Sequence, residues 1–167
     1  DGASYIFPDA WEKYLNPIPI DERSNLVKAY YKRLTSNDYN VKIEAAKAWS
    51  IWEASTSKLF QSGKSLHHFE TSSVAEAFAR IECHYFINKG FFEKDGWILD
   101  NIDKIRNIPS VIIQGRYDVV CPMYTAWDLF RKWPEADFHV IQDAGHSMTE
   151  KGIASKLIEY TNKFSKF

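Results

Sequence analysis

The second half of the chain alternates strand-like and helical segments, and this order limits the possible folds more than any other feature. A short apolar run after Pro109, residues 110–114, is typical of a buried strand. A helix is predicted over about 123–133, a second strand over 138–142 and a last helix over about 152–164. This order predicts parallel pairing in an α/β sheet. Two strands do not bury both faces of a parallel sheet, so we expect further strands earlier in the intact protein.

The segment before about residue 100 has a helical pattern. One helix is predicted over about 21–35, with Asp21 as its cap, and a second over about 41–60. A third is predicted over about 73–89, where Ser73 begins a sequence with capping-box spacing. The sequence thus favours helices in its first part and an α/β arrangement in its second part.

The change of pattern predicts two domains, a mostly helical one over 1–98 and part of an α/β domain over 99–167. With 21 Lys and Arg against 22 Asp and Glu, no basic surface for nucleic acid or membranes is expected. No apolar run reaches the roughly 18 residues that span a bilayer. Cys83 and Cys121 do not suggest a disulfide scaffold, so we expect a reducing compartment, the cytoplasm.

Two residues suited to acid–base chemistry follow the two predicted strands. Asp118 comes just after the first strand, and His146 comes just after the second. In open α/β sheets, sites form beyond the carboxyl ends of the strands, so we expect these side chains to meet. An aspartate bonded to one imidazole nitrogen fixes the tautomer and leaves the other nitrogen free to accept a proton. The order of acid then histidine is that of a hydrolase triad.

A triad in that order requires a serine upstream, on a Gly-x-Ser-x-Gly turn. The seven glycines include no pair four residues apart, so this turn is absent from the chain. Ser147 is too close to His146 to be the nucleophile and is predicted to cap the last helix. Cys121 lies on the loop of Asp118 and is not expected to replace the serine. The chain therefore has a candidate acid and base without a nucleophile.

Two glutamates fall at the edges of predicted apolar helix faces. Glu53 falls beside Trp49 on the second helix, at about 100° of rotation per residue. Glu82 lies beside an apolar face on the third helix, formed by Val74, Phe78, Ile81 and Tyr85. Buried carboxylates are costly unless they are paired or ligated. The pattern alone leaves two interpretations, boundary residues that reach solvent or ligands of a cation. No histidine or aspartate constellation accompanies them, so neither a metal nor a cofactor is expected.

Several blocks of the sequence, in the same order, resemble proline iminopeptidases, which are serine peptidases of the α/β-hydrolase fold. The blocks lie at 2–11, 33–36, 45–53, 79–86, 115–118 and 133–147. The resemblance covers essentially the whole chain. It implies the C-terminal part of an α/β-hydrolase fold preceded by a mostly helical cap. It also implies that Asp118 is the triad acid, that His146 is the triad base, and that Glu53 and Glu82 bind the N-terminal amine of the substrate.

The same resemblance implies that the intact protein releases N-terminal proline from peptides. Its implied partners are a peptide with N-terminal proline and a missing N-terminal half that carries the nucleophile, so this chain by itself is expected to be inactive. A protonated N-terminal proline has two N–H donors, and each glutamate can accept one. Two alternatives are a non-catalytic fragment that only binds, and another α/β-hydrolase such as an esterase or epoxide hydrolase. The paired glutamates disfavour the latter, because neutral substrates need no anionic clamp.

Overall fold

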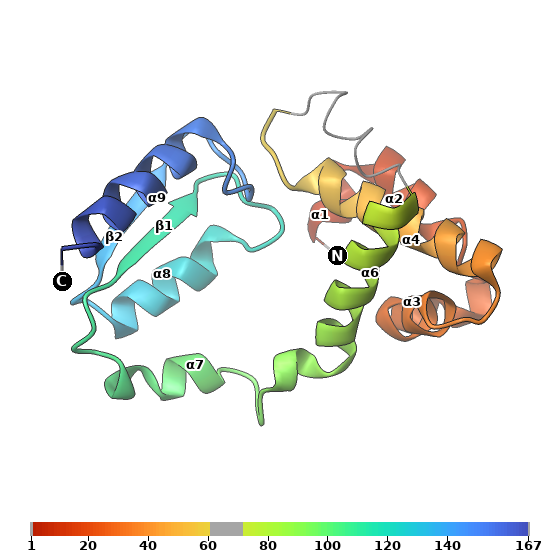
Figure 1. The fold of residues 1–167 in the computed structure, drawn as a ribbon, viewed down its shortest axis with the longest axis horizontal. Helices are drawn as coiled ribbons and strands as arrows, with labels where there is room; N and C mark the ends of the chain where they lie inside the picture. Colours follow the sequence, from red (N-terminus) through yellow and green to blue (C-terminus); the bar gives the residue numbers. More distant parts are fainter. Residues whose placement is uncertain (1, 61–71, 167) are drawn as a thin grey trace. The chain divides into compact units, whose positions relative to one another are not determined.

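The computed structural model describes residues 2–60 and 72–166 (Figure 1). The chain divides into two compact units, the first made of 1–56 and 61–92 and the second of 57–60 and 93–167. We expected a boundary in the sequence between residues 98 and 99, whereas it lies between residues 92 and 93. The second unit also includes the short segment 57–60, which lies within the predicted helical part of the sequence. That these units are a cap and part of a catalytic domain stays a prediction.

The first unit contains helices and no strand among its described residues. Its elements are α1 (Gly2–Ile6), α2 (Pro8–Leu15), η1 (Ile20–Asn25), α3 (Leu26–Leu34), α4 (Tyr39–Thr56), α6 (Ser72–Ile87) and η2 (Lys89–Phe91). Helix α6 packs against both α3 and α4, and α2 packs against α4. The sequence patterns did not predict α1 or α2. The unit therefore contains two helices, α1 and α2, that we did not expect.

Two of the predicted helix boundaries were wrong. Asp21 does not cap α3, because residues 20–25 form a 3-10 turn. Asn25 caps it instead, with a side-chain oxygen that accepts a hydrogen bond of 3.0 Å from the backbone N–H of Lys28. Helix α4 ends at Thr56 and not near residue 60, since the residues that follow pack within the second unit. Both differences arise from contacts that apolar periodicity does not report.

The buried face of α6 also differs from the predicted one. Ala75, Ala79 and Cys83 are 0% exposed, whereas Ile81 is 62% and Tyr85 53% exposed. The three buried residues lie four apart on one side of the helix, and their small size lets α6 approach α3 and α4 closely. The prediction followed the large apolar side chains and chose the wrong face, because alanine contributes little to an apolar pattern.

Stacked aromatic rings fill the core of the first unit. The rings of Tyr14 and Tyr30 stack with centroids 4.5 Å apart, and Trp49 meets Tyr30 edge-on at 5.2 Å. Trp11 and Trp52 pack beside them, 5.1 Å apart. Trp49 is only 2% exposed, so its indole is part of this core. This core joins α2, α3 and α4 into one body.

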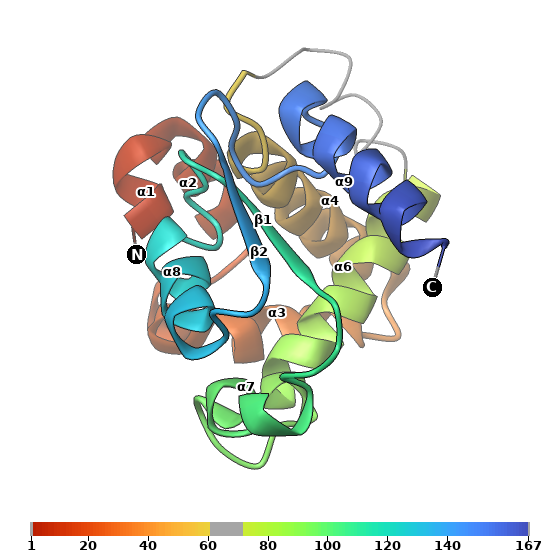
Figure 2. The same cartoon turned by 90° about the vertical axis from the view of Figure 1, so that its left-hand side faces the viewer.

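The second unit contains a parallel pair of strands between helices. Its elements are α7 (Trp97–Asp100), η3 (Ile102–Lys104), β1 (Val111–Gly115), α8 (Met123–Lys132), β2 (Asp137–Ile141) and α9 (Lys151–Phe164). Strands β1 and β2 pair in register from Val111 with Asp137 to Gly115 with Ile141. Figures 1 and 2 show α8 and α9 on opposite sides of the strands. The predicted order of strand, helix, strand and helix is confirmed, with mixed helix and sheet as expected of an α/β protein.

The two strands are only partly covered in this chain. Gly115 alone among their residues is buried, and the others are partly or fully exposed. A parallel sheet is normally covered on both faces. The partial cover agrees with the expectation of further strands, which stays a prediction.

Among the described residues, no helix combines the length and the apolar character needed to cross a membrane.

Candidate active site

Asp118 and His146 meet beyond the carboxyl ends of β1 and β2, as the sequence predicts. The Nδ1 atom of His146 lies 2.9 Å from Oδ2 of Asp118. Parallel pairing sets Gly115 opposite Ile141, so the loops that follow the two strands leave the sheet side by side. These loops are so close that a Cβ atom on Gly115 would lie 1.8 Å from the carbonyl oxygen of Gly145. Only glycine fits there, and its small size brings the acid and the imidazole together.

The Asp118 carboxylate is enclosed by donors. Its Oδ1 atom accepts hydrogen bonds from the backbone N–H groups of Val120 (3.0 Å) and Cys121 (2.8 Å). Its Oδ2 atom accepts a hydrogen bond of 3.2 Å from Nε2 of Gln114, in addition to the one from His146. Burial opposes the charge of this 5% exposed side chain, but the bonds from His146 and the backbone outweigh it and lower the pKa of Asp118.

The ionised aspartate fixes the tautomer of the imidazole. An ionised carboxylate only accepts hydrogen bonds, so Nδ1 of His146 carries the proton and Nε2 faces away from Asp118. The hydrogen bond to Asp118 and the nearby Cys121 side chain raise the pKa of His146 from 6.5 to about 10, while burial opposes the rise. The imidazole is 40% exposed here. Protein that covered it would lower its pKa toward the value that a general base needs.

We expect the pair to make this chain most stable in the weakly acidic range. The raised pKa of His146 means that its stabilisation is complete below pH 6.5 and is lost as the pH rises to about 10. The lowered pKa of Asp118 means that its stabilisation is present above pH 3.8 and is lost at lower pH. Urea unfolding of the chain and of its Asp118→Asn variant measures this. Their difference in unfolding free energy should be largest between pH 3.8 and 6.5, and a difference independent of pH would contradict the expectation.

Ser147 does not cap the last helix, contrary to our prediction. Its hydroxyl forms a hydrogen bond of 2.8 Å with Oγ1 of Thr149, and α9 begins only at Lys151. The residue at the cap position is Glu150, whose side chain makes no capping bond. Ser147 therefore belongs to the loop of the candidate base.

The two glutamates lie in the first unit, near Tyr14. Nε1 of Trp49 donates a hydrogen bond of 2.6 Å to Oε2 of Glu82, which ties α4 to α6. Burial, the neighbouring Tyr30, and the negative charges of Glu53 and Glu82 all raise the pKa of Tyr14. Both glutamates are partly buried. Of the two, Glu82 is tied to the aromatic core by its hydrogen bond with Trp49.

The sequence analysis missed three residues that lie close to the acid–histidine pair or to the two glutamates. Tyr14 lies on α2, a helix that was not predicted, although its spacing of three residues from Trp11 is a helical signal. Gln114 was assigned to an apolar strand, yet an amide at the last but one position of that strand could have marked a polar neighbour. Glu150 gave no local signal for its link to Leu59, because the two residues are 91 positions apart in sequence. Within the described ranges, no group of three metal-ligating side chains occurs.

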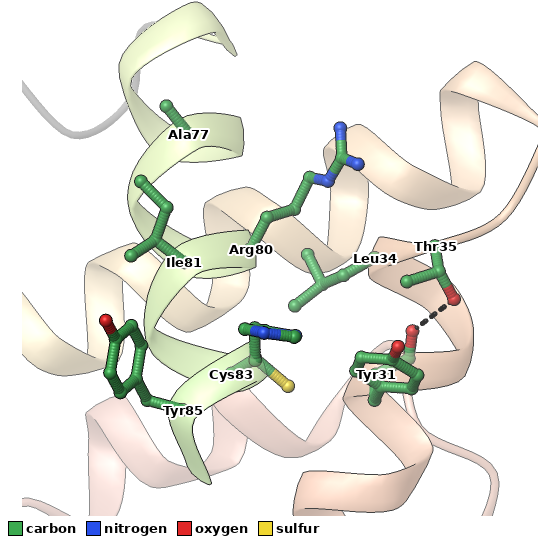
Figure 3. A pocket seen from close by; sticks show the side chains of 9 residues that line it. Tyr31, Leu34, Thr35, Ala77, Arg80, Ile81, Cys83 and Tyr85 are labelled. Atoms are coloured by element: carbon green, nitrogen blue, oxygen red, sulfur yellow. Dashed lines mark hydrogen bonds between the residues drawn. The ribbon is translucent and has the colours of Figure 1, made fainter. Parts of the chain in front are cut away.

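A separate groove lies between α3 and α6, with a volume of about 480 Å³ (Figure 3). Tyr31 and Leu34 line it from α3, and Ile81 and Tyr85 line it from α6. Neither candidate glutamate lines it. Arg80, which Figure 3 shows reaching away from Tyr85, pairs with Glu76 at 3.1 Å. The groove therefore offers little free charge to a ligand.

A carboxylate–imidazole pair beyond the ends of parallel strands is a geometry suited to acid–base chemistry. No protein-family model matches the chain. Curated proteins do match it over nearly its whole length. It is 57% identical over 98% of its residues to a probable proline iminopeptidase of Leptolyngbya boryana, 50% over 97% to the proline iminopeptidase of Arabidopsis thaliana, and 41% over 95% to that of Neisseria gonorrhoeae.

The matches cover only part of each relative's own sequence. The chain spans about half their length, 51%, 43% and 49% respectively. The resemblance to proline iminopeptidases is confirmed over nearly all of this chain, and the relatives contain a further part with no counterpart here.

Proposed function

We propose that the complete protein is a proline iminopeptidase, a serine peptidase of the α/β-hydrolase fold that releases proline from the N-terminus of peptides. The observation that carries this proposal is the hydrogen bond of 2.9 Å between Asp118 and His146, in a chain 57% identical to a probable proline iminopeptidase. His146 takes the proton of a serine nucleophile on Nε2 and later gives it to the leaving amine. Asp118 orients the imidazole and stabilises the imidazolium. The serine belongs to the part of the enzyme outside this chain.

In this proposal Glu53 and Glu82 bind the substrate's protonated amine. The secondary ammonium of an N-terminal proline carries two N–H donors, and each carboxylate accepts one in a charge-assisted bond. The bond from Trp49 does not exhaust Glu82, because a carboxylate has about four acceptor positions. Two neighbouring carboxylates also repel each other when the site is empty, and a bound cation relieves that repulsion. The aromatic rings beside them would exclude water from the pyrrolidine ring.

A proline-naphthylamide assay tests the function. We expect turnover by the complete protein and none by this chain, because the chain has no Gly-x-Ser-x-Gly turn. The assay is run on both, and on the chain mixed with the separately produced remainder. Stoichiometric turnover by the pure chain would show that our account of the nucleophile is wrong. An inactive complete protein, shown to be folded, would overturn the proposed function.

Cys121 should make the complete enzyme sensitive to bulky thiol reagents. Its thiol is exposed and its backbone N–H holds the Asp118 carboxylate, so an adduct there would shift the acid's loop. A misplacement of the acid by about 1 Å should lower the activity on the order of a hundredfold. The measurement is kcat after modification confirmed by mass, with Cys121→Ser as a control that the reagent does not modify at this position. Full activity after complete modification of Cys121 would refute the expectation.

A further inference from the structure

The loop that carries His146 is held at its backbone by the segment 57–60. The carbonyl oxygen of Ser57 accepts hydrogen bonds from the backbone N–H groups of His146 (3.0 Å) and Ser147 (2.7 Å). The segment belongs to the second unit, although it directly follows α4 in the chain. The position of the candidate base is thus fixed by residues far away in sequence.

Glu150 completes this attachment. Its Oε1 atom accepts a hydrogen bond of 2.8 Å from the N–H of Gly145, and its Oε2 atom accepts one of 3.3 Å from the N–H of Leu59. One carboxylate therefore joins the two backbone segments. The fit is tight, because a Cβ atom on Gly145 would lie 3.0 Å from the nitrogen of Leu59 and 3.2 Å from Oε1 of Glu150. A side chain larger than that of glycine at position 145 would therefore press against the segment 57–60.

The contacts of Glu150 differ from those of a helix cap and from those of an ion pair. It stands at the cap position of α9, but its side chain makes no capping bond to that helix. Among the described residues, it also has no partner in an ion pair. Its negative charge is instead directed to two backbone N–H groups, both of them in segments that meet at His146. Hydrogen bonds to a charged group contribute more than neutral ones.

We propose that Glu150 is a positioning residue, whose carboxylate clamps the loop of His146 to the segment 57–60 and so holds the imidazole in line with Asp118. It acts through Gly145 and Leu59, and it touches neither the imidazole nor the substrate. The clamp needs both oxygens as acceptors. Its consequence for catalysis rests on the proposed function, whereas its effect on the loop does not.

Backbone amide exchange and imidazole NMR on this chain test the clamp. The variants are Glu150→Ala, the milder Glu150→Gln, and the control Glu159→Gln, which changes an exposed glutamate on α9. Glu150→Ala should speed exchange at Gly145 and Leu59 by about tenfold or more. It should also weaken the downfield Nδ1–H signal of His146. A glutamine can accept at only one of the two N–H groups, so Glu150→Gln should have a smaller effect of the same kind. Glu159→Gln should match the parent.

The outcomes separate the clamp from a structural role and from the proposed function. Faster exchange at the first amides of α9, with Gly145 and His146 unchanged, would mean a helix-capping role and would overturn the proposal. If Glu150→Ala does not fold, an unaltered His146 signal in the folded Glu150→Gln variant would overturn it equally. In the complete enzyme, Glu150→Ala should lower kcat by about tenfold and leave KM unchanged. An inactive parent enzyme would refute the function, and the exchange result would still decide the clamp.

Discussion

Replacing Asp118 with asparagine should lower the kcat of the complete enzyme for a proline amide by about 10⁴-fold. The asparagine side chain keeps the shape but loses the charge, so it no longer stabilises the imidazolium or enforces the Nδ1–H tautomer. The three other donors to this carboxylate, Gln114 and the N–H groups of Val120 and Cys121, would also face a poorer acceptor. KM should change little, because the candidate amine ligands lie in the other unit.

The control for this change is Asp128→Asn, which alters an exposed aspartate on α8. It should leave kcat and KM at the parent values. Imidazole NMR provides a second measurement, since Asp118→Asn should bring the pKa of His146 down from about 10 toward 6.5. A loss of less than about tenfold in kcat, in a folded Asp118→Asn variant, would exclude Asp118 as the triad acid.

Changing Glu53 or Glu82 to glutamine should lower kcat/KM for proline amides by roughly ten- to a hundredfold each. The change keeps the side-chain shape and removes the charge that attracts the ammonium. Glutamine at position 82 can still accept the hydrogen bond from Trp49, so the link between α4 and α6 is preserved. The double variant should be worse than either single one, with effects that do not add, since both groups bind one ligand.

A neutral ester without an amine separates recognition from folding. The variants should hydrolyse it nearly as well as the parent, because the acid–histidine pair is unchanged. Glu44→Gln, at an exposed position on the same helix as Glu53, should affect neither substrate. Equal losses on the amide and the ester would mean that the glutamates are structural, and the proposed specificity would then be wrong.

The acid–histidine pair was predictable because each of its two residues has a local signal in the sequence. Each residue follows a short apolar run, and parallel pairing of two such runs brings their carboxyl ends to one edge. Helices α8 and α9 were predictable for a similar reason, since each is amphipathic and follows a strand. The first unit was predicted less well, because α6 is buried through alanines and a cysteine, which an apolar pattern undervalues.

The anchor of His146 was beyond any reading of local pattern. Ser57 accepts its hydrogen bonds through a backbone carbonyl, which every residue has, so its identity gives no signal. Glu150 has no pattern in the sequence that points to Leu59, and only the folded chain shows that its carboxylate reaches that residue. Contacts made by the backbone across long separations become visible only in the folded chain.

The segment 57–60 also constrains the order in which this protein can fold. Leu59 and Glu150 are 91 positions apart, and residues of the first unit flank the segment on both sides. During synthesis the segment therefore leaves the ribosome long before its partners exist, while N-terminal elements generally fold first. The aromatic core of the first unit can form early, whereas the loop of His146 gains its anchor only when the start of α9 has been made. The candidate base is thus among the last parts of this chain to reach its final position.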